Sequence, residues 1–398
     1  MIITLPVGSP ATGDDFIDRE RETAFILSVI EKDHVMLVAP RRFGKTSIML
    51  NIVKILQSRR RLCIFLDIES VNSPGEFITE LVTALVECGG TNHRARFLSA
   101  LGRAFVRVQE SIEEIETPAF RARLRSNLRA EFSDDWYEKA KKLDEIIAVI
   151  AEPACIILDE FPVAIQNMEV GDARKFLHWF RRFRQVYPGV KFIVGGSVSI
   201  DHVVYNIGGI AVINDFRRIT IGGFDEGVAL SVIEHVFCRE GWEYSPEIGR
   251  AVLDTVGDPY IPYFLMILLS GLKEEVEISG RTPSPTLVDH VYNRRILSSA
   301  GRHYFEHYSR RLQILYSWQE AKAARAILSE VSVAESLPVS IAYDIFGRSY
   351  GSEDEDAFRG LLAQLDHDFY VTLETCGELR FYSKMLQDWW RIYYAGAS

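Results

Sequence analysis

Short apolar runs alternate with longer amphipathic stretches between residue 16 and about residue 224. The apolar runs are Val35–Val38, Leu62–Asp67, Cys155–Leu158, Lys191–Gly195 and Ile219–Ile221. Continuous runs of this length are typical of strands that are buried on both faces of a parallel sheet. The stretches between them carry apolar residues at helical spacing, as the crossover connections of parallel strands require. The pattern predicts an α/β fold for this part of the chain.

The remaining residues show a different pattern. Residues 225 to about 300 are helical without strands, which indicates a helical lid. From about residue 301 the chain reads as helical up to Asp368, and then Phe369–Leu373 and Leu379–Tyr382 flank a turn that contains Gly377. A hairpin after three helices predicts a winged helix. We therefore predict domains at 1–224, with a helical insertion at about 91–145, at 225–300 and at 301–398.

The first apolar run leads into a segment with candidate chemistry. Val35–Val38 is followed by Ala39–Ser47, and a helical pattern starts at once after Thr46. The free N–H groups and the dipole of a helix start attract phosphate. Lys45 would reach the β- and γ-phosphates, and the Thr46 hydroxyl would bind Mg²⁺. The predicted ATP-binding residues are Pro40, Arg41, Arg42, Phe43, Gly44, Lys45, Thr46 and Ser47.

This loop departs from the full phosphate-binding pattern at one position. The pattern opens with Gly, and Ala39 stands there in this chain. A bare Gly-Lys-Thr tripeptide is common enough to occur by chance in an ordinary strand–turn–helix unit. The strand before it and the helix after it are what favour the phosphate loop.

A second segment supplies paired carboxylates. Cys155–Leu158 runs directly into Asp159 and Glu160. Open α/β sheets bind their ligands at the carboxyl ends of the strands. Asp159 would hold Mg²⁺ through water, and Glu160 would activate the attacking water as a general base. Alone, such a pair is also compatible with a helix cap, but together with the loop it predicts nucleotide hydrolysis, with Asp67 nearby at another strand end.

Three further residues are candidates for the γ-phosphate end of the site. Ser197 ends the run that starts at Lys191, so its hydroxyl is a candidate partner of the lytic water or of the γ-phosphate, with a helix cap as the alternative. Arg217 and Arg218 stand just before the run Ile219–Ile221. Either is a candidate arginine finger, acting in its own subunit or in a neighbouring one. A surface salt bridge is the alternative role for both.

These motifs resemble a known family when taken in order. They are Phe16–Glu22, Ala39–Thr46, Leu158–Phe161, Gly196-Ser197, Val256–Tyr260 and Phe381–Arg391. The chain is similar to the prokaryotic AAA-type ATPases of the archaeal ATPase family, which are related to the STAND and origin-recognition ATPases. The resemblance implies a P-loop NTPase core with an AAA-like parallel sheet, a helical lid, a C-terminal winged helix, and ATP and Mg²⁺ as ligands. It also implies that Arg19 and Pro259 contribute to ATP binding.

The departures from that family bear on turnover. Ala39 replaces the usual Gly, and the lid carries no obvious second-sensor Arg. Some relatives bind nucleotide tightly and hydrolyse it slowly. The resemblance therefore implies an ATPase and leaves its turnover rate open, with slow turnover as one outcome.

Composition limits where such a protein would work. The five cysteines are far apart and have neither metal-site nor disulfide spacing, which favours a reducing compartment. The longest apolar run, Ile261–Leu269, is much shorter than the ~18 residues that a membrane span needs. No signal peptide is visible. We expect a soluble, cytoplasmic protein with no membrane partner.

Charge is distributed unevenly along the chain, whose net charge is −10. Between Leu315 and Ser398, seven Lys and Arg residues stand against thirteen Asp and Glu residues, including Glu353–Asp356. Binding to a DNA backbone requires cations on the contacting face. The charge therefore favours a protein-interaction or autoinhibitory role for the predicted winged helix.

Basic residues gather in two other segments. Between Arg94 and Arg129, eight arginines stand against four glutamates. The second group is Arg174, Lys175, Arg181, Arg182 and Arg184, on a helix whose apolar stripe is Phe176, Leu177, Phe180 and Phe183. We expect these arginines to face outward, as a solvated surface or a subunit contact. Nucleic acid, bound through residues 94–129 and 174–184, is the alternative partner.

The sequence leaves two functions open. The leading hypothesis is an ATPase that acts as a nucleotide-driven switch and regulates a partner protein or a self-assembly, with anti-phage defence as one candidate setting. The alternative is a DNA-binding protein that uses ATP to load or remodel DNA. A small-molecule kinase is disfavoured because no acceptor pocket can be recognised.

Overall fold

A computed structural model describes Pro10 and residues 19–40, 42–88, 91–112, 120–151, 153–196, 200–207 and 210–395. The predicted site residues Arg41 and Ser197 lie outside these ranges. The chain divides into two compact units. The described residues of Thr12–Arg41 and Lys45–Ile221 form the N-terminal unit, and Arg42–Gly44 with Gly222–Ser398 belong to the C-terminal unit. The lid and the winged helix fall in one unit, so the boundary near residue 300 stays a prediction.

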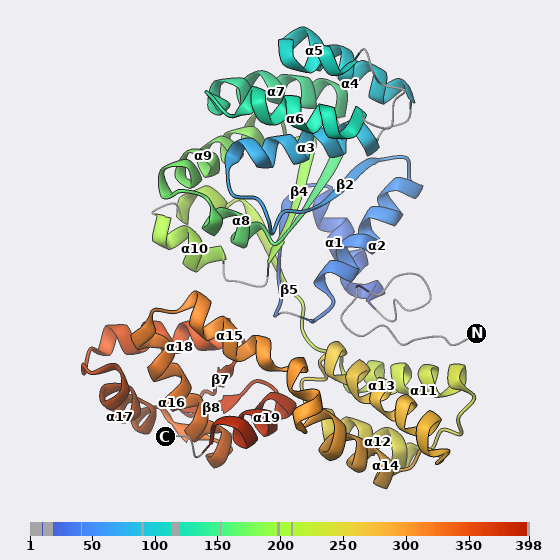
Figure 1. Cartoon of the computed structure of the whole chain (residues 1–398), viewed down its shortest axis with the longest axis vertical. Coiled ribbons are helices and arrows are strands. Elements are labelled where there is room, and N and C mark those ends of the chain that lie inside the picture. The colour runs from blue at the N-terminus through green and yellow to red at the C-terminus, as the bar shows by residue number, and fades with distance from the viewer. Residues whose placement is uncertain are drawn as a thin grey trace. The chain divides into compact units, whose positions relative to one another are not determined.

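The N-terminal unit is built on a five-stranded sheet of order β2-β3-β4-β1-β5, in which every neighbouring pair is parallel (Figure 1). The strands are β1 (His34–Val38), β2 (Leu62–Asp67), β3 (Ala154–Asp159), β4 (Val190–Gly196) and β5 (Phe216–Thr220). Every residue of β3 and β4 is buried, as expected for central strands covered by helices on both faces. The predicted α/β fold with a parallel sheet is confirmed.

Helices cover both faces of this sheet. One face carries α1 (Glu20–Ile30) and α2 (Lys45–Ser58), and the other carries α3 (Pro74–Cys88), α8 (Phe161–Asn167) and α9 (Val170–Val186) (Figure 1). The unit also contains α10 (Ile200–Ile207) and the 3₁₀ turn η2 (Ile210–Ile213). The stripe predicted on α9 is buried, and its Phe180 ring meets Phe192 of β4 at 4.8 Å between centroids.

The predicted insertion between the strands of Asp67 and Asp159 is helical. It consists of α4 (Thr91–Ala104), α5 (Val106–Ile112), α6 (Phe120–Phe132) and α7 (Trp136–Ala151). Several of its arginines already have partners. Arg121 pairs with Glu87 at 2.7 Å, Arg125 pairs with Glu80 at 2.5 Å, and the Arg94 guanidinium lies over the Phe120 ring.

The expectation that the arginines of α9 face outward is wrong for Arg184, which is 2% exposed. Its guanidinium donates to both carboxylate oxygens of Asp215, at 2.8 and 2.9 Å, and to the carbonyl of Val212. Arg182 pairs with the buried Asp144 carboxylate at 2.8 Å. A buried cation needs such a partner, so Arg184 belongs to the core rather than to a binding face.

The C-terminal unit begins with helices. They are α11 (Glu226–Glu240), α12 (Pro246–Val256), α13 (Pro262–Ser279), α14 (Pro285–Val291), a π-helical segment η3 (Tyr292–Ile296), a 3₁₀ segment η4 (Ser299–Tyr304) and α15 (Glu306–Leu315). Side-chain oxygens of Asp225, Ser245 and Ser284 cap the starts of α11, α12 and α14. No helix of the described residues is long and apolar enough to cross a membrane.

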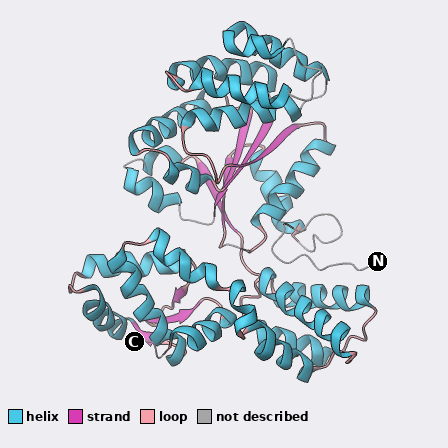
Figure 2. Cartoon of the chain, viewed as in Figure 1, coloured by secondary structure: helices cyan, strands magenta, loops and turns pink. Residues whose placement is uncertain are grey.

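The last part of the unit has the predicted hairpin after three helices (Figure 2). Its elements are α16 (Trp318–Ala334), β6 (Leu337–Pro338), α17 (Val339–Tyr350), α18 (Glu355–His367), β7 (Val371–Leu373), β8 (Glu378–Phe381) and α19 (Lys384–Tyr394). The strands form an antiparallel sheet of order β6-β8-β7. The expectation of unbroken helix up to Asp368 missed β6, because two residues show no periodicity and gain their strand character only by pairing with β8.

Candidate functional site

The site is assembled at the carboxyl edge of the parallel sheet. The strand before the loop, β1, and the strand before the acidic pair, β3, both pair with β4. Parallel strands bring their carboxyl ends to one edge, so the start of α2 and the end of β3 face the same space. The sequence motifs around Lys45 and Asp159 therefore meet although more than a hundred residues separate them.

Four predicted residues come together there. The Thr46 hydroxyl donates to Asp159 Oδ2 at 2.6 Å. Lys45 Nζ lies 3.4 Å from Asp159 Oδ1 and 3.6 Å from Glu160 Oε1. Lys45 and Asp159 are only 6% and 4% exposed. Buried charges persist only when they are paired, so the two carboxylates hold the ammonium until another anion replaces them.

The acidic pair has a specific backbone arrangement. Glu160 adopts φ 55°, in the left-handed region, where it precedes the first turn of α8. Its N–H donates to Asp159 Oδ1 at 3.0 Å. A left-handed non-glycine residue costs roughly 1–3 kcal/mol and persists only where its surroundings impose it. Strain of this kind is common at functional sites, and the Glu160 carboxylate lies 3.6 Å from Lys45 Nζ.

The oxygen donors suit a hard divalent cation. The Thr46 hydroxyl and the Asp159 carboxylate are adjacent oxygen donors. Mg²⁺ prefers such oxygen donors and completes its shell with water and phosphate oxygens. Thr46 and Asp159 fit the metal-binding role that the sequence assigns to them.

Sequence reasoning missed Gly195, which lets the Lys45 side chain cross β4. A Cβ added at Gly195 would lie 2.9 Å from Lys45 Cδ and 2.4 Å from Met49 Cε. Both distances are shorter than carbon atoms tolerate, so any side chain there would push the lysine stem aside. The signal was present in the chain as Gly195-Gly196 at the end of a strand run, where a glycine marks a close approach.

Replacing Gly195 by Ala is therefore expected to weaken ATP binding while the sheet stays folded. A displacement of about 1 Å in such a site costs on the order of tenfold to a hundredfold. Calorimetric titration with ATP measures the effect. In the double variant Gly195→Ala, Met49→Ala, the methionine clash is gone and only the lysine clash remains, so the loss should persist.

Gly171→Ala is the matched control, since an added Cβ there meets nothing within 4 Å. Its ATP affinity should equal that of the wild type. If Gly195→Ala binds ATP with wild-type affinity, ATP binding does not require the Lys45 side chain to pass over β4 at Gly195.

Other predicted residues occupy varied places in the N-terminal unit. Arg19 is 5% exposed, stands before α1, and pairs with Glu22 at 2.5 Å. Asp67 aligns with Asp159 across β2 and β3, and its carboxylate accepts the N–H of Glu69 at 3.0 Å. Pro40 and Ser47 are buried beside the loop and at the start of α2.

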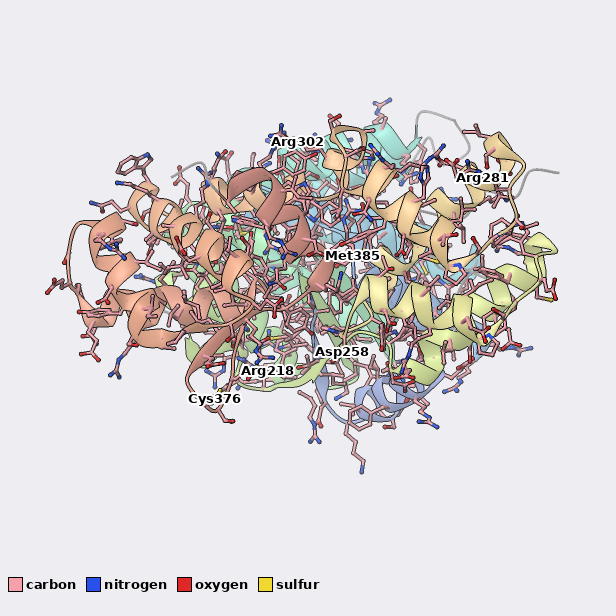
Figure 3. The ribbon with its side chains drawn as sticks, turned by 90° about the horizontal axis from the view of Figure 1, so that it is seen from below. Arg218, Asp258, Arg281, Arg302, Cys376 and Met385 are labelled. Atoms are coloured by element: carbon pink, nitrogen blue, oxygen red, sulfur yellow. The ribbon has the colours of Figure 1, made fainter. Side chains whose placement is uncertain are left out.

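The expectation that Arg217 and Arg218 precede a strand is wrong, because both lie inside β5. They align with Val35 and Met36 of β1, well before the strand ends (Figure 3 labels Arg218). From the sequence alone the strand was expected to start at Ile219, after the two charged residues. Pairing with β1 extends it back to Phe216. An arginine-finger role for either residue stays a prediction.

The remaining predicted residues belong to the C-terminal unit. The Arg42 guanidinium lies 3.7 Å from the centre of the Tyr263 ring, and the Phe43 ring lies 6.0 Å from that of Tyr382. Arg42 and Gly44 both have positive φ, 73° and 83°, as a tight loop requires. Pro259 follows Asp258 in a cis peptide and packs near Gly223.

Comparisons with known proteins identify the fold. No protein-family model and no curated protein sequence matches the chain. Among solved structures, a Walker-type ATPase of Pyrococcus abyssi aligns with a TM-score of 0.64 at 14% identity, over 97% of this chain and 99% of the other. The ORC2 protein of Aeropyrum pernix, solved with ADPNP and ADP, aligns with a TM-score of 0.57 at 13% identity, over 96% and 95%. The chain therefore has the archaeal-type P-loop AAA ATPase fold.

Proposed function

We propose that this protein is a Mg²⁺-dependent ATPase whose nucleotide state switches its interaction with a partner protein or with further copies of itself. One observation carries the proposal: Lys45, Thr46, Asp159 and Glu160 converge within 2.6–3.6 Å at the carboxyl edge of the sheet. ATP hydrolysis requires these residue types: a lysine to bind phosphate, oxygen donors to hold the metal ion, and a carboxylate to activate water.

Each residue has a separate task in this proposal. Lys45 leaves its two carboxylates and binds the β- and γ-phosphate oxygens. Thr46 and Asp159 hold Mg²⁺, which neutralises phosphate charge when bound. Glu160, freed from Lys45, accepts the proton of the attacking water.

The switch follows from the exchange of ion pairs. Before binding, Lys45 ties the start of α2 to the end of β3 through Asp159 and to Glu160. ATP takes over the ammonium, phosphate release leaves it with the β-phosphate alone, and dissociation of ADP returns it to the carboxylates. The two states therefore differ in the forces on the start of α8, which Glu160 precedes, and a partner binding one state better would shift the equilibrium.

The experiment compares the protein with ATP, ADP and no nucleotide. We expect phosphate release with ATP and Mg²⁺, none with EDTA, and slower amide hydrogen exchange at the starts of α2 and α8 with nucleotide bound. Phosphate release with no difference in exchange between ATP and ADP would leave an ATPase but exclude the switch. No nucleotide binding would exclude both.

The DNA-loading alternative has less support from these residues. The exposed charges of α18, the third helix of the predicted winged helix, are mainly acidic, with Glu355, Asp356 and Asp366 against Arg359. In the second basic group, Arg182 and Arg184 are committed to Asp144 and Asp215. A cytoplasmic location and a role in anti-phage defence remain parts of the proposal that depend on the identity of the partner.

A further inference from the structure

An apolar groove of about 910 Å³ runs along α18 in the C-terminal unit. Its apolar wall includes Val339, Phe358, Leu362 and Leu373, and Leu373 is 49% exposed. Leu373 ends β7, and the hairpin turn that follows carries Cys376 (Figure 3). No other described residue of this unit fills the groove, so its apolar surface is available to a segment from outside.

The rim of this groove is acidic. Glu355 and Asp366 line it at the two ends of α18, and Asp356 is exposed beside Glu355. Arg359 is the cation among the lining residues and pairs with Glu355 at 2.5 Å, which partly neutralises Glu355 and leaves Asp366 as the stronger acidic position. An occupant should therefore combine a small or apolar face with arginines or lysines at its edges.

Gly360 of α18 does not line the groove, although Ala363, one turn later, does. It stands exposed within α18, and an added Cβ there would meet nothing within 4 Å. Glycine within a helix destabilises it relative to alanine. The isolated chain offers no packing reason for this glycine. Ala363 is therefore the small apolar side chain that the groove itself offers to a second helix.

Helix α4 has the complementary surface. Its exposed residues include Ala95, Ser99, Arg96 and Arg103, and the helix contains no carboxylate. These residues line a shallow groove of about 600 Å³ beside α7, where Glu145 is the acidic member. Within the part of the chain that the structure describes, Arg103 donates a hydrogen bond to the Ser99 hydroxyl of its own helix, at 2.8 Å. Small residues in the middle and arginines at the edges match what the α18 groove requires.

We propose that α4 of one copy of this chain docks along the α18 groove of a second copy, with Arg96 and Arg103 facing Glu355 and Asp366. In this contact, α4 lies in the groove along α18 of the second copy, and that α18 lies in the groove beside α4, as in ridges-into-grooves packing. The two surfaces differ, so the contact is heterologous and adds copies in a ring or a filament.

This inference rests on the proposed function in one respect: it names a second copy as the partner. Its test reads assembly rather than hydrolysis, so either proposal can fail without the other. A single helix pair buries less than the ~800 Å² per partner of a standard interface, so assembly should depend on protein concentration.

The test uses reciprocal charge reversal in the full chain. Variant A carries Arg96→Glu and Arg103→Glu, and variant B carries Glu355→Arg and Asp366→Arg. Each variant alone opposes like charges at the contact and should dissociate on the order of tenfold or more readily than the wild type. When A and B alternate along the assembly, every contact pairs opposite charges, so a mixture of the two variants should assemble again. Sedimentation velocity over a range of concentrations, with and without ATP, measures each state.

Matched controls are Arg129→Glu on α6 and Glu330→Lys on α16, both exposed and outside the two grooves. They should assemble as the wild type does. Ala363→Met supplies a steric test that needs no charge change: Ala363 lines the groove, so the larger side chain should fill it and abolish assembly.

Three results would overturn the inference. They are a wild type that stays monomeric under all these conditions, assembly that survives in A and B alone, and a mixture that stays dissociated while both variants are folded. Loss of salt-dependent DNA binding in variant A, with assembly unchanged, would assign α4 to nucleic acid instead.

Discussion

Glu160→Gln is expected to lower ATP turnover by about 10² to 10⁴-fold, the usual contribution of a general base. The amide keeps the shape of the side chain and the hydrogen bond from the Glu160 N–H to Asp159, but it cannot accept the proton. Binding of ATP should survive or increase slightly, because one of the carboxylates that compete for Lys45 is neutralised. Phosphate release and nucleotide occupancy measure the two effects separately.

Asp159→Asn separates the metal role from the base role. Asp159 accepts the Thr46 hydroxyl, so its loss should weaken Mg²⁺-dependent ATP binding itself. Glu169→Gln, an exposed glutamate before α9 that makes no capping bond, is the matched control and should turn over normally. Normal turnover in Glu160→Gln would move the base elsewhere, and Asp67 would be the first residue to test.

Lys45→Met should lower ATP affinity by at least about a hundredfold. Hydrogen bonds to charged groups contribute roughly 1.5–3 kcal/mol each, and the ammonium makes more than one to the phosphates. The methionine retains most of the buried stem. The substitution also leaves Asp159 and Glu160 without their counter-charge, so the variant should be less stable to heat at neutral pH and regain stability where carboxylates protonate.

Lys54→Met provides the comparison, because Lys54 is an exposed lysine on the same helix. Calorimetry with ATP and thermal unfolding should both give wild-type values for it. An unchanged ATP affinity in a folded Lys45→Met protein would contradict the assignment of the phosphate loop.

The chemistry of the site was predictable from the sequence because it depends on short contiguous segments. A strand run, a turn ending in Gly44-Lys45-Thr46 and a helix start define a phosphate loop by themselves. A second run ending in Asp159-Glu160 defines its acidic partner. The hairpin around Gly377 was predictable for the same reason, since turn residues and strand alternation are local signals.

What depends on distant residues was not predictable. The position of β4 between β1 and β3, which brings the two motifs together, is a matter of strand order, and the need for Gly195 appears only when Lys45 crosses that strand. Arg184 looked like a surface residue because its partner, Asp215, comes 31 positions later, in the turn before β5. Local sequence determined which elements form and which residue types they carry. Only the tertiary structure decided which charges are buried and paired, because burial and pairing arise from contacts between segments that no local pattern encodes.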